Sequence, residues 1–434
     1  MPICIAVNVH AEQFLTDDSN YCQNQRTLKS QDNNLRRQLD ADNPLPDAAN
    51  NRKIVSIELE QLNVFNTELE EENNFLFRFA NRAHMTTEPE VIHSVLLFEE
   101  GDVYNPRKLL ESERLLRKQG YLYDARINAK LDCDGNVHVK VITRDLWTLL
   151  PEISFSRSGG KNESSIGFRE SNFLGWGKRV SFSRTRDADR TGYLFVYDDP
   201  HIFSSRYQGR LEYSDNDDGK RHYLDVSYPF FSIDTPYSYG VTSYSDQRRE
   251  SLYYRGDVVS EFEQKTLLNR AYFGHSSQLG NSWTQRIKLG IENREETFRE
   301  TPFTRFPIAE DRTLSYPYVS GQWFEDHYVK VRNFDSIYRT EDLNLGWNIH
   351  ALLGYSSDDF SDDASRTIYS LSLSKAHYSG DNQLWRFKAD LDGYWNEETD
   401  DVENLFASTQ LQYYLNTTLR QSWYAKVRLQ YAEN

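Results

Sequence analysis

The residues after Trp147 alternate between apolar and polar side chains in one long series of runs. In 385–391, Trp, Phe, Ala and Leu alternate with Arg, Lys and Asp, and the same period returns in 405–415 and 423–431. A period of two indicates a β-strand, because successive side chains point to opposite faces of a sheet. Roughly 14 to 16 such runs follow one another, so this part of the chain predicts a large antiparallel sheet.

The length of the runs and their connections fit a membrane. A tilted strand needs about 9 to 11 residues to cross a bilayer, and its connections are typically short on one side and long on the other. Here 234–236 is a short turn, whereas 215–218, 358–363 and 397–403 are longer and acidic. A soluble sandwich would also alternate, but it would not need a belt of aromatic residues at one turn. That belt comprises Tyr228, Phe230, Phe231, Tyr237 and Tyr239.

We therefore predict a mainly β fold in which 147–434 forms a transmembrane antiparallel β-barrel. The composition excludes two other classes of protein. Mean hydropathy is −0.75 and hydrophobic residues make up 38% of the chain, which excludes a bundle of membrane-spanning helices. The net charge of −16 would repel a polyanion, so we expect no nucleic-acid partner.

The first 52 residues carry little folding information. Residues 1–11 are apolar and end in Val-His-Ala, which predicts the remnant of a signal peptide; an ordinary apolar N-terminus is the alternative. Residues 12–52 are rich in Asn, Asp, Gln and Arg and predict a flexible leader. Cys4, Cys22 and Cys133 lack the close spacing of metal or redox sites. A disulfide between Cys22 and Cys133 is an option that the spacing neither requires nor excludes.

Residues 53–146 combine strand-like segments with apolar patterns of helical length, and this mixture predicts a small α/β domain. The domain begins with a strand-like segment, 54–62, and continues with apolar patterns of helical length in 75–83 and 90–97. Its clearest helix has Asn105 as N-cap and Pro106 in the first turn, and basic residues collect near its end.

A β-hairpin ends this domain. Asp134-Gly135 forms the predicted turn, and alternating valines in 137–141 form the returning strand. If the first strand lies at the edge of its sheet, its unpaired backbone groups can receive an extended segment of another chain. The apolar positions of this candidate edge are Ala125, Ile127, Ala129 and Leu131.

Two segments resemble a known family. Leu96 to Asn105, the helix that follows and Gly120 to Ala125 resemble a POTRA domain. Residues 167–178 resemble the first barrel hairpin of the bacterial surface antigen superfamily, the outer-membrane assembly and secretion barrels. Two of the motif's glycines allow a tight turn between strands without a Cβ clash. The motif residues are Asn172, Phe173, Gly175 and Gly177.

The resemblance implies a POTRA-like periplasmic domain over 53–146 followed by a barrel in the outer membrane of a Gram-negative cell. Members of this superfamily use the periplasmic domain to receive clients and the barrel to insert or export them. The expected partners are outer-membrane lipid, lipopolysaccharide and an unfolded or extended protein client or lipid, and we expect a monomer. A passive porin-like channel with an anchoring domain is the alternative.

No motif in the sequence indicates an enzyme. The ten His residues include no zinc-protease pattern, and neither a nucleophile elbow nor a phosphate-binding loop is present. We expect no catalytic residue, cofactor or resident metal. The acidic cluster Asp358, Asp359, Asp362 and Asp363 could bind divalent ions that bridge lipopolysaccharide, although a solvated loop explains it more simply.

The end of the sequence departs from the family. Superfamily members carry an Arg-Gly motif on a loop inside the barrel, and the segments nearest to it, 254–257 and 331–334, do not match. The last strands of such barrels commonly end on an aromatic residue, whereas Tyr431 is followed by Ala-Glu-Asn. We therefore expect the barrel to be incomplete at the C-terminus; a divergent barrel that closes on 423–431 is the alternative.

Overall fold

In the computed structural model the chain divides into two compact units, with the boundary between Leu146 and Trp147. The structure describes residues 45–158, 161–187, 190–280, 282–336, 339–361, 364–380, 382–418 and 421–433. The predicted signal-peptide remnant and most of the predicted leader lie outside these residues. The described end of the leader, 45–52, is packed rather than free, since Ala49 is fully buried in the core of the first unit.

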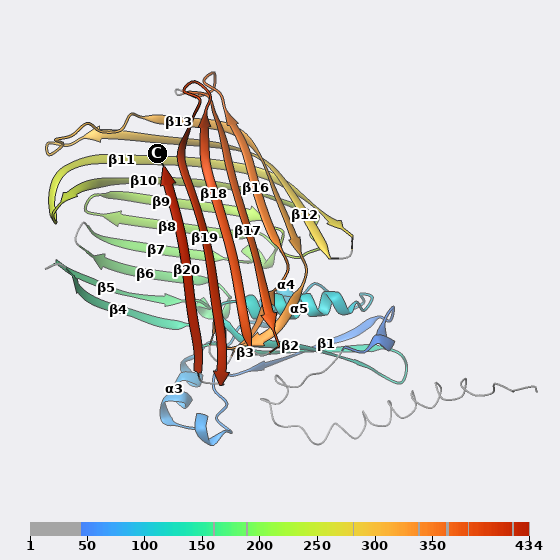
Figure 1. The fold of residues 1–434 in the computed structure, drawn as a ribbon. Helices are drawn as coiled ribbons and strands as arrows, with labels where there is room; N and C mark the ends of the chain where they lie inside the picture. The colour runs from blue at the N-terminus through green and yellow to red at the C-terminus, as the bar shows by residue number, and fades with distance from the viewer. Residues whose placement is uncertain are drawn as a thin grey trace, which may run out of the picture. The chain divides into compact units, whose positions relative to one another are not determined.

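From residue 45 onward, the described part of the first unit contains one short sheet and the helices α3, α4 and α5 (Figure 1). The predicted order was a strand, two helices and a hairpin; the described residues follow this order but place three α-helices between β1 and β2. In chain order the elements are η2 (Asp47–Ala49), β1 (Ile54–Leu62), η3 (Glu70–Glu72), α3 (Phe75–Ala83), α4 (Pro89–Val95), α5 (Pro106–Lys118), β2 (Leu122–Leu131) and β3 (Val137–Asp145).

The order of strands in this sheet is β1-β3-β2. β3 pairs parallel with β1 and antiparallel with β2, so β2 is an edge strand. α5 begins at Asn105, whose side chain accepts a hydrogen bond from the backbone N–H of Arg107 at 3.0 Å. This is the predicted N-cap, and it satisfies a backbone donor that has no partner within the helix.

The core of the first unit lies between the sheet and the helices. Leu109 and Leu116 of α5 are fully buried against apolar side chains of all three strands, among them Ile127 and Val139. α3 differs, because none of its residues is buried and Phe75, Leu76 and Phe79 are exposed. Cys133 is exposed in the turn between β2 and β3; Cys4 and Cys22 lie outside the described residues.

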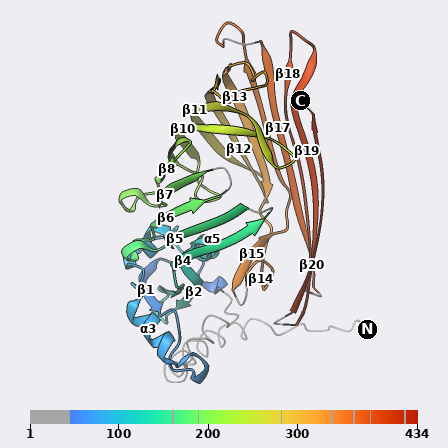
Figure 2. The same ribbon diagram turned by 90° about the vertical axis from the view of Figure 1, so that its left-hand side faces the viewer.

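The second unit is one large antiparallel sheet of fifteen strands (Figures 1 and 2). The number lies within the predicted range. The strands of the sheet are β4 (Leu149–Ser158), β5 (Lys161–Glu170), β6 (Arg179–Arg186), β7 (Thr191–Asp199), β8 (Gln208–Asn216), β9 (Gly219–Tyr228), β10 (Tyr237–Tyr254), β11 (Asp257–Leu279), β12 (Trp283–Glu300), β13 (Arg312–Glu325), β16 (Asn348–Ser356), β17 (Arg366–Ser379), β18 (Gln383–Asn396), β19 (Asp401–Thr418) and β20 (Gln421–Glu433).

The remaining elements of this unit lie in its turns. Two are short 3-10 helices, η4 (Phe173–Gly175) and η5 (Ile202–Ser204). The other two, β14 (Tyr328–Arg332) and β15 (Thr340–Asn344), form a separate two-stranded sheet between β13 and β16 (Figure 2).

The sheet is not closed in the described residues, which differs from the predicted barrel. Every strand pairs with its neighbour in the order β4 to β20, and these two strands form the edges. Closure would require β4 and β20 to pair with each other. β20 instead pairs only with β19, and all of its described residues are exposed.

The two faces of the sheet differ in character, as the alternation predicts. Along β12, Leu289 and Ile291 are 63% and 64% exposed, whereas Glu292 on the opposite face is only 3% exposed. In the described part of the chain the apolar face of this strand is therefore exposed, while its polar face holds buried charges in ion pairs. No described helix is long and apolar enough to cross a membrane.

The α5 packing supplies a matched test of the first unit's stability. We expect Leu109→Ala to lower the free energy of unfolding by about 2 to 5 kcal/mol, because it leaves a cavity where a fully buried side chain was. Leu110→Ala is the control, since Leu110 is 48% exposed on the same helix. Urea unfolding of the full chain, followed by amide exchange of β2 and β3, measures both. Equal losses for the two variants would contradict the assigned core.

Candidate functional site

The predicted edge residues lie on β2, and their backbone groups point away from β3. The N–H of Ile127 donates to Oε2 of Glu113 at 2.8 Å, so this residue does not face its neighbour in the β3 ladder. Because the direction of these groups alternates along a strand, those of Ala125, Ala129 and Leu131 also point outward. All four candidate residues therefore present their backbone to the open edge.

Two of the four are already engaged by α5. The carbonyl of Ala125 accepts a hydrogen bond from Nη1 of Arg117 at 3.0 Å, and the N–H of Ile127 is held by Glu113. Arg117 and Glu113 also pair with each other, Nη1 to Oε1, at 2.5 Å. The sequence analysis did not foresee this contact; the signal for it was a Glu and an Arg four residues apart on the predicted helix.

The other half of the edge has no such cover among the described residues. Among the residues that the structure describes, no hydrogen bond from another element reaches the backbone of Ala129 or Leu131. Beyond Leu131, Asp132 closes the turn by accepting hydrogen bonds from the N–H groups of Asn136 at 2.7 Å and Asp134 at 2.9 Å. The bond from Asn136 is the main cause that lowers the pKa of Asp132 to about 2, so the free half ends beside a permanent negative charge.

The first-hairpin motif forms the turn between β5 and β6. Asn172 is buried, and its Oδ1 accepts a hydrogen bond from the N–H of Gly177 at 2.8 Å. Phe173 donates its N–H to the carbonyl of Lys178 at 2.8 Å, which closes the turn. Gly175 and Gly177 have φ angles of +79° and +65°, a region that residues with a Cβ seldom adopt. The glycines allow the turn to adopt these angles without the strain that a Cβ would add.

The next turn at the same end of the sheet repeats this geometry without the motif. Ile202 donates its N–H to the carbonyl of Tyr207 at 2.9 Å, as Phe173 does to Lys178. The N–H of His201 binds Asp199 Oδ1 at 3.1 Å, as that of Asn172 binds Glu170 Oε1 at 2.8 Å. Each turn has an apolar residue at positive φ, Leu174 at +55° and Phe203 at +51°.

The sequence analysis missed this second turn because it contains no glycine. The signal that could have found it is an acidic residue that ends the strand before each turn. Both turns expose apolar side chains, and Phe203 is 96% exposed. An ion pair of 3.1 Å between Lys178 and Asp199 links them.

The β14–β15 hairpin was also missed, and it packs on the polar face of the sheet. Arg386 of β18 lies between two apolar residues of that strand. Its guanidinium donates two hydrogen bonds, of 2.7 and 2.5 Å, to the carboxylate of Asp335 at the hairpin tip. Phe334 lies edge-on to Tyr378 and Tyr414 at centroid distances of 5.9 and 6.1 Å. Residues 331–334, at the end of β14 and the start of the tip, are the segment that departs from the superfamily's loop motif.

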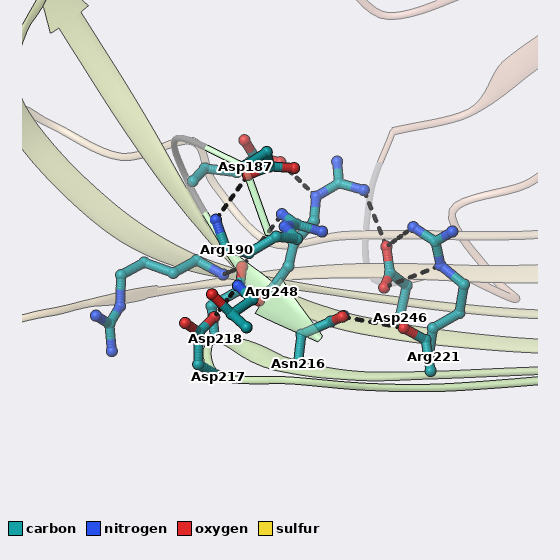
Figure 3. Close-up of polar contacts among 12 residues, drawn as sticks. Asp187, Arg190, Asn216, Asp217, Asp218, Arg221, Asp246 and Arg248 are labelled. Carbon is teal, nitrogen blue, oxygen red and sulfur yellow. Dashed lines mark hydrogen bonds and ion pairs between the residues drawn. The ribbon is translucent and has the colours of Figure 1, made fainter. Parts of the chain in front are cut away.

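Charged residues cluster on β9 and β10 and in the turns that follow β6 and β8 (Figure 3). Asp246 lies between Arg221 at 3.3 Å and Arg248 at 2.9 Å, and Arg190 pairs with Asp218 at 3.1 Å. These acidic groups are neutralised by arginines. In the described part of the chain no group of three His, Cys, Asp or Glu side chains could hold a metal ion.

Comparison with known proteins bears on the first unit most directly. Residues 78–144 match the POTRA family model, described as a surface antigen variable number repeat. This match confirms the resemblance to a POTRA domain found in the sequence. No curated protein sequence matches the chain.

Three solved structures match the chain at low sequence identity. CdiB from Acinetobacter baumannii is 12% identical, with a TM-score of 0.42, over 97% of this chain and 88% of its own. CdiB from Escherichia coli is 13% identical, with a TM-score of 0.39, over 96% and 98%. BamA from Haemophilus ducreyi lacking POTRA domains 1–3 is 12% identical, with a TM-score of 0.34, over 87% and 81%.

The turn geometry predicts a specific weak point. Asn172→Ala leaves the buried N–H of Gly177 without its acceptor, which costs about 1 to 3 kcal/mol. The Gly177 amide should then exchange about tenfold faster or more. Ser171→Ala, one residue earlier, is the control and should leave the rate unchanged. Residue-resolved hydrogen exchange checks this, and an unaltered Gly177 rate in N172A would refute the role of Asn172.

Proposed function

We propose that this POTRA-containing chain assists the insertion or translocation of protein or lipid across the outer membrane of a Gram-negative bacterium. The observation that carries the proposal is the half-free edge of β2 in a domain that matches the POTRA family. An extended client segment would add to this edge as a further strand. Backbone hydrogen bonds would then supply affinity with little demand on the client's sequence.

The candidate residues have separate roles in this proposal. Ala129 and Leu131 offer free backbone groups to the client, while Ala125 and Ile127 anchor the same strand to α5. The reaction is non-covalent, so it needs neither a catalytic residue nor a cofactor. We accordingly propose that the protein is not an enzyme.

The second unit supports an outer-membrane location. Its exposed apolar residues alternate with polar ones over long antiparallel strands, which is the arrangement of strands that face lipid on one side. We propose that the apolar face contacts membrane lipid and that the acidic loops meet lipopolysaccharide. Asp358 and Asp359 lie in one such loop, whose other two acidic residues are outside the described ranges. We further propose that the first unit lies in the periplasm and that the protein acts as a monomer.

A passive porin-like channel is the second candidate. The observation that favours it is the charged lining of the polar face, where Arg270 and Glu292 pair and Arg221 pairs with Asp246. The β14–β15 hairpin on that face weighs against free conduction, because it would occupy part of a lumen. Conductance in planar bilayers, with client insertion independent of the first unit, would favour the channel.

Depletion of the protein followed by quantitative proteomics and lipid analysis of the outer membrane tests the proposal. We expect a subset of outer-membrane proteins or one lipid class to decline before growth slows. An unchanged outer membrane after depletion would contradict an assembly or translocation role.

The edge itself can be tested with one substitution. Ala129→Pro removes an outward-pointing N–H and should lower client insertion several-fold without disturbing the β3 ladder. Cys133→Ser in the adjacent exposed turn is the control and should insert clients normally. Reconstituted vesicles with a radiolabelled outer-membrane client provide the measurement. Equal insertion by the two variants would remove this edge from consideration.

The membrane-facing side can be tested on β12. Ile291→Arg places a charge near the middle of the strand on the apolar face and should destabilise the inserted protein by about 2 to 4 kcal/mol. Lys288→Arg on the polar face keeps its charge and should have little effect. Urea titration of protein folded into lipid vesicles measures the two. A neutral effect of I291R would argue that this face does not contact lipid.

A further inference from the structure

We infer that α5 blocks half of the β2 edge, so that a client strand pairs only with the Ala129–Leu131 half. Glu113 and Arg117 fill the positions that a client would take beside Ala125 and Ile127. The inference rests on the proposed function, because it specifies where and how the client binds.

The two side chains reproduce the hydrogen bonds of a strand. One residue of a parallel strand would donate its N–H to the carbonyl of Ala125 and accept the N–H of Ile127. Arg117 makes the first of these bonds at 3.0 Å and Glu113 makes the second at 2.8 Å. Their spacing suits the task, since four residues along a helix rise about 6 Å. Two residues along a strand span about 6.6 Å.

The block is secured by charge and by burial. Arg117 binds Oε1 of Glu113 at 2.5 Å while it holds the Ala125 carbonyl, and the two side chains are only 3% and 2% exposed. Arg126 extends from β2 toward the same carboxylate and reaches Oε1 at 3.9 Å. Withdrawing either side chain would break a buried, hydrogen-bonded ion pair, which is strongly unfavourable. A client strand therefore has little power to displace the pair.

The block sets the length of the docking site. The outward-pointing groups left to a client are the carbonyl of Ile127 and the N–H and C=O groups of Ala129 and Leu131. A client can therefore pair over a length of about three residues. Pairing over so short a register is weak, and weak pairing suits a client that must be passed on. The same block keeps the rest of the edge from pairing with a second copy or with aggregating chains.

The test uses the full chain in detergent micelles and a defined probe. The probe is a fluorescent hexapeptide, Thr-Val-Thr-Val-Thr-Val, acetylated and amidated at its ends. Its affinity is measured by anisotropy, and the β2 amides are followed by residue-resolved hydrogen exchange. In the wild-type chain the peptide should slow exchange at Ala129 and Leu131 about tenfold and leave Ile127 unchanged.

The opening variant replaces both members of the pair, Glu113→Met with Arg117→Met. Two apolar side chains of similar volume are well tolerated in place of a buried ion pair, so α5 should stay folded. We expect the Ile127 amide to exchange about tenfold faster in this variant, the peptide to protect it, and the peptide to bind about tenfold more tightly. Lys118→Met, an exposed position on the same helix, is the control and should match the wild type.

The outcomes separate this inference from the proposed function. Peptide protection of Ile127 in the wild-type chain would overturn the block, as would equal affinity of the wild type and the double variant. The wild-type pattern decides the matter even if the double variant does not fold. Absence of protection anywhere on β2, in any of the proteins, would instead remove the docking site on which the proposed function relies.

Discussion

Every strand carries backbone N–H and C=O groups along both of its sides, and the structure depends on where these groups find partners. Inside the large sheet the backbone N–H and C=O groups of each strand form hydrogen bonds with the neighbouring strands. This is the condition for crossing a bilayer without unpaired polar backbone groups. The first and last strands of that sheet, β4 and β20, are each paired on one side only. In the described part of the chain the same holds for β1 and β2, the two outer strands of the small sheet. Each of these edges is a place where another segment can pair as a further strand.

The edge of β2 differs from those of β4 and β20 because side chains of a helix bind part of it. Glu113 and Arg117 lie four residues apart, on the side of α5 that packs against β2. The ion pair thus performs two tasks with one contact. It fixes the helix to the strand, and it supplies the hydrogen bonds that a neighbouring strand would otherwise provide.

Two turns of the large sheet have the same geometry with different sequences. The β5–β6 and β7–β8 turns close with equivalent backbone hydrogen bonds, although only the first has the Asn and Gly residues of the motif. The second turn places Phe203 at positive φ, where a residue with a Cβ is strained, and leaves its ring exposed. The apolar tips of the two turns lie at the same end of the sheet, since antiparallel strands bring alternate turns to one edge.

Much of the fold could be predicted from the sequence, because the decisive signals were local. The two-residue alternation predicted the antiparallel strands, and Asn105 with Pro106 predicted where α5 begins. The hairpin signal at Asp134-Gly135 predicted β2 and β3. Such features depend on the period of the backbone and on caps a few residues away.

The contacts that define the candidate site could not be predicted in the same way. Whether the N–H of Ile127 is free depends on the side chain of Glu113, which reaches it only after α5 has packed on β2. The β14–β15 hairpin likewise needs Arg386, 51 residues away, to fix its tip. The sequence by itself determined most of the strands and helices, though not the β14–β15 hairpin, and which of their faces are apolar. Only the tertiary structure decided which backbone groups of the β2 edge remain open, because that depends on side chains brought together by packing.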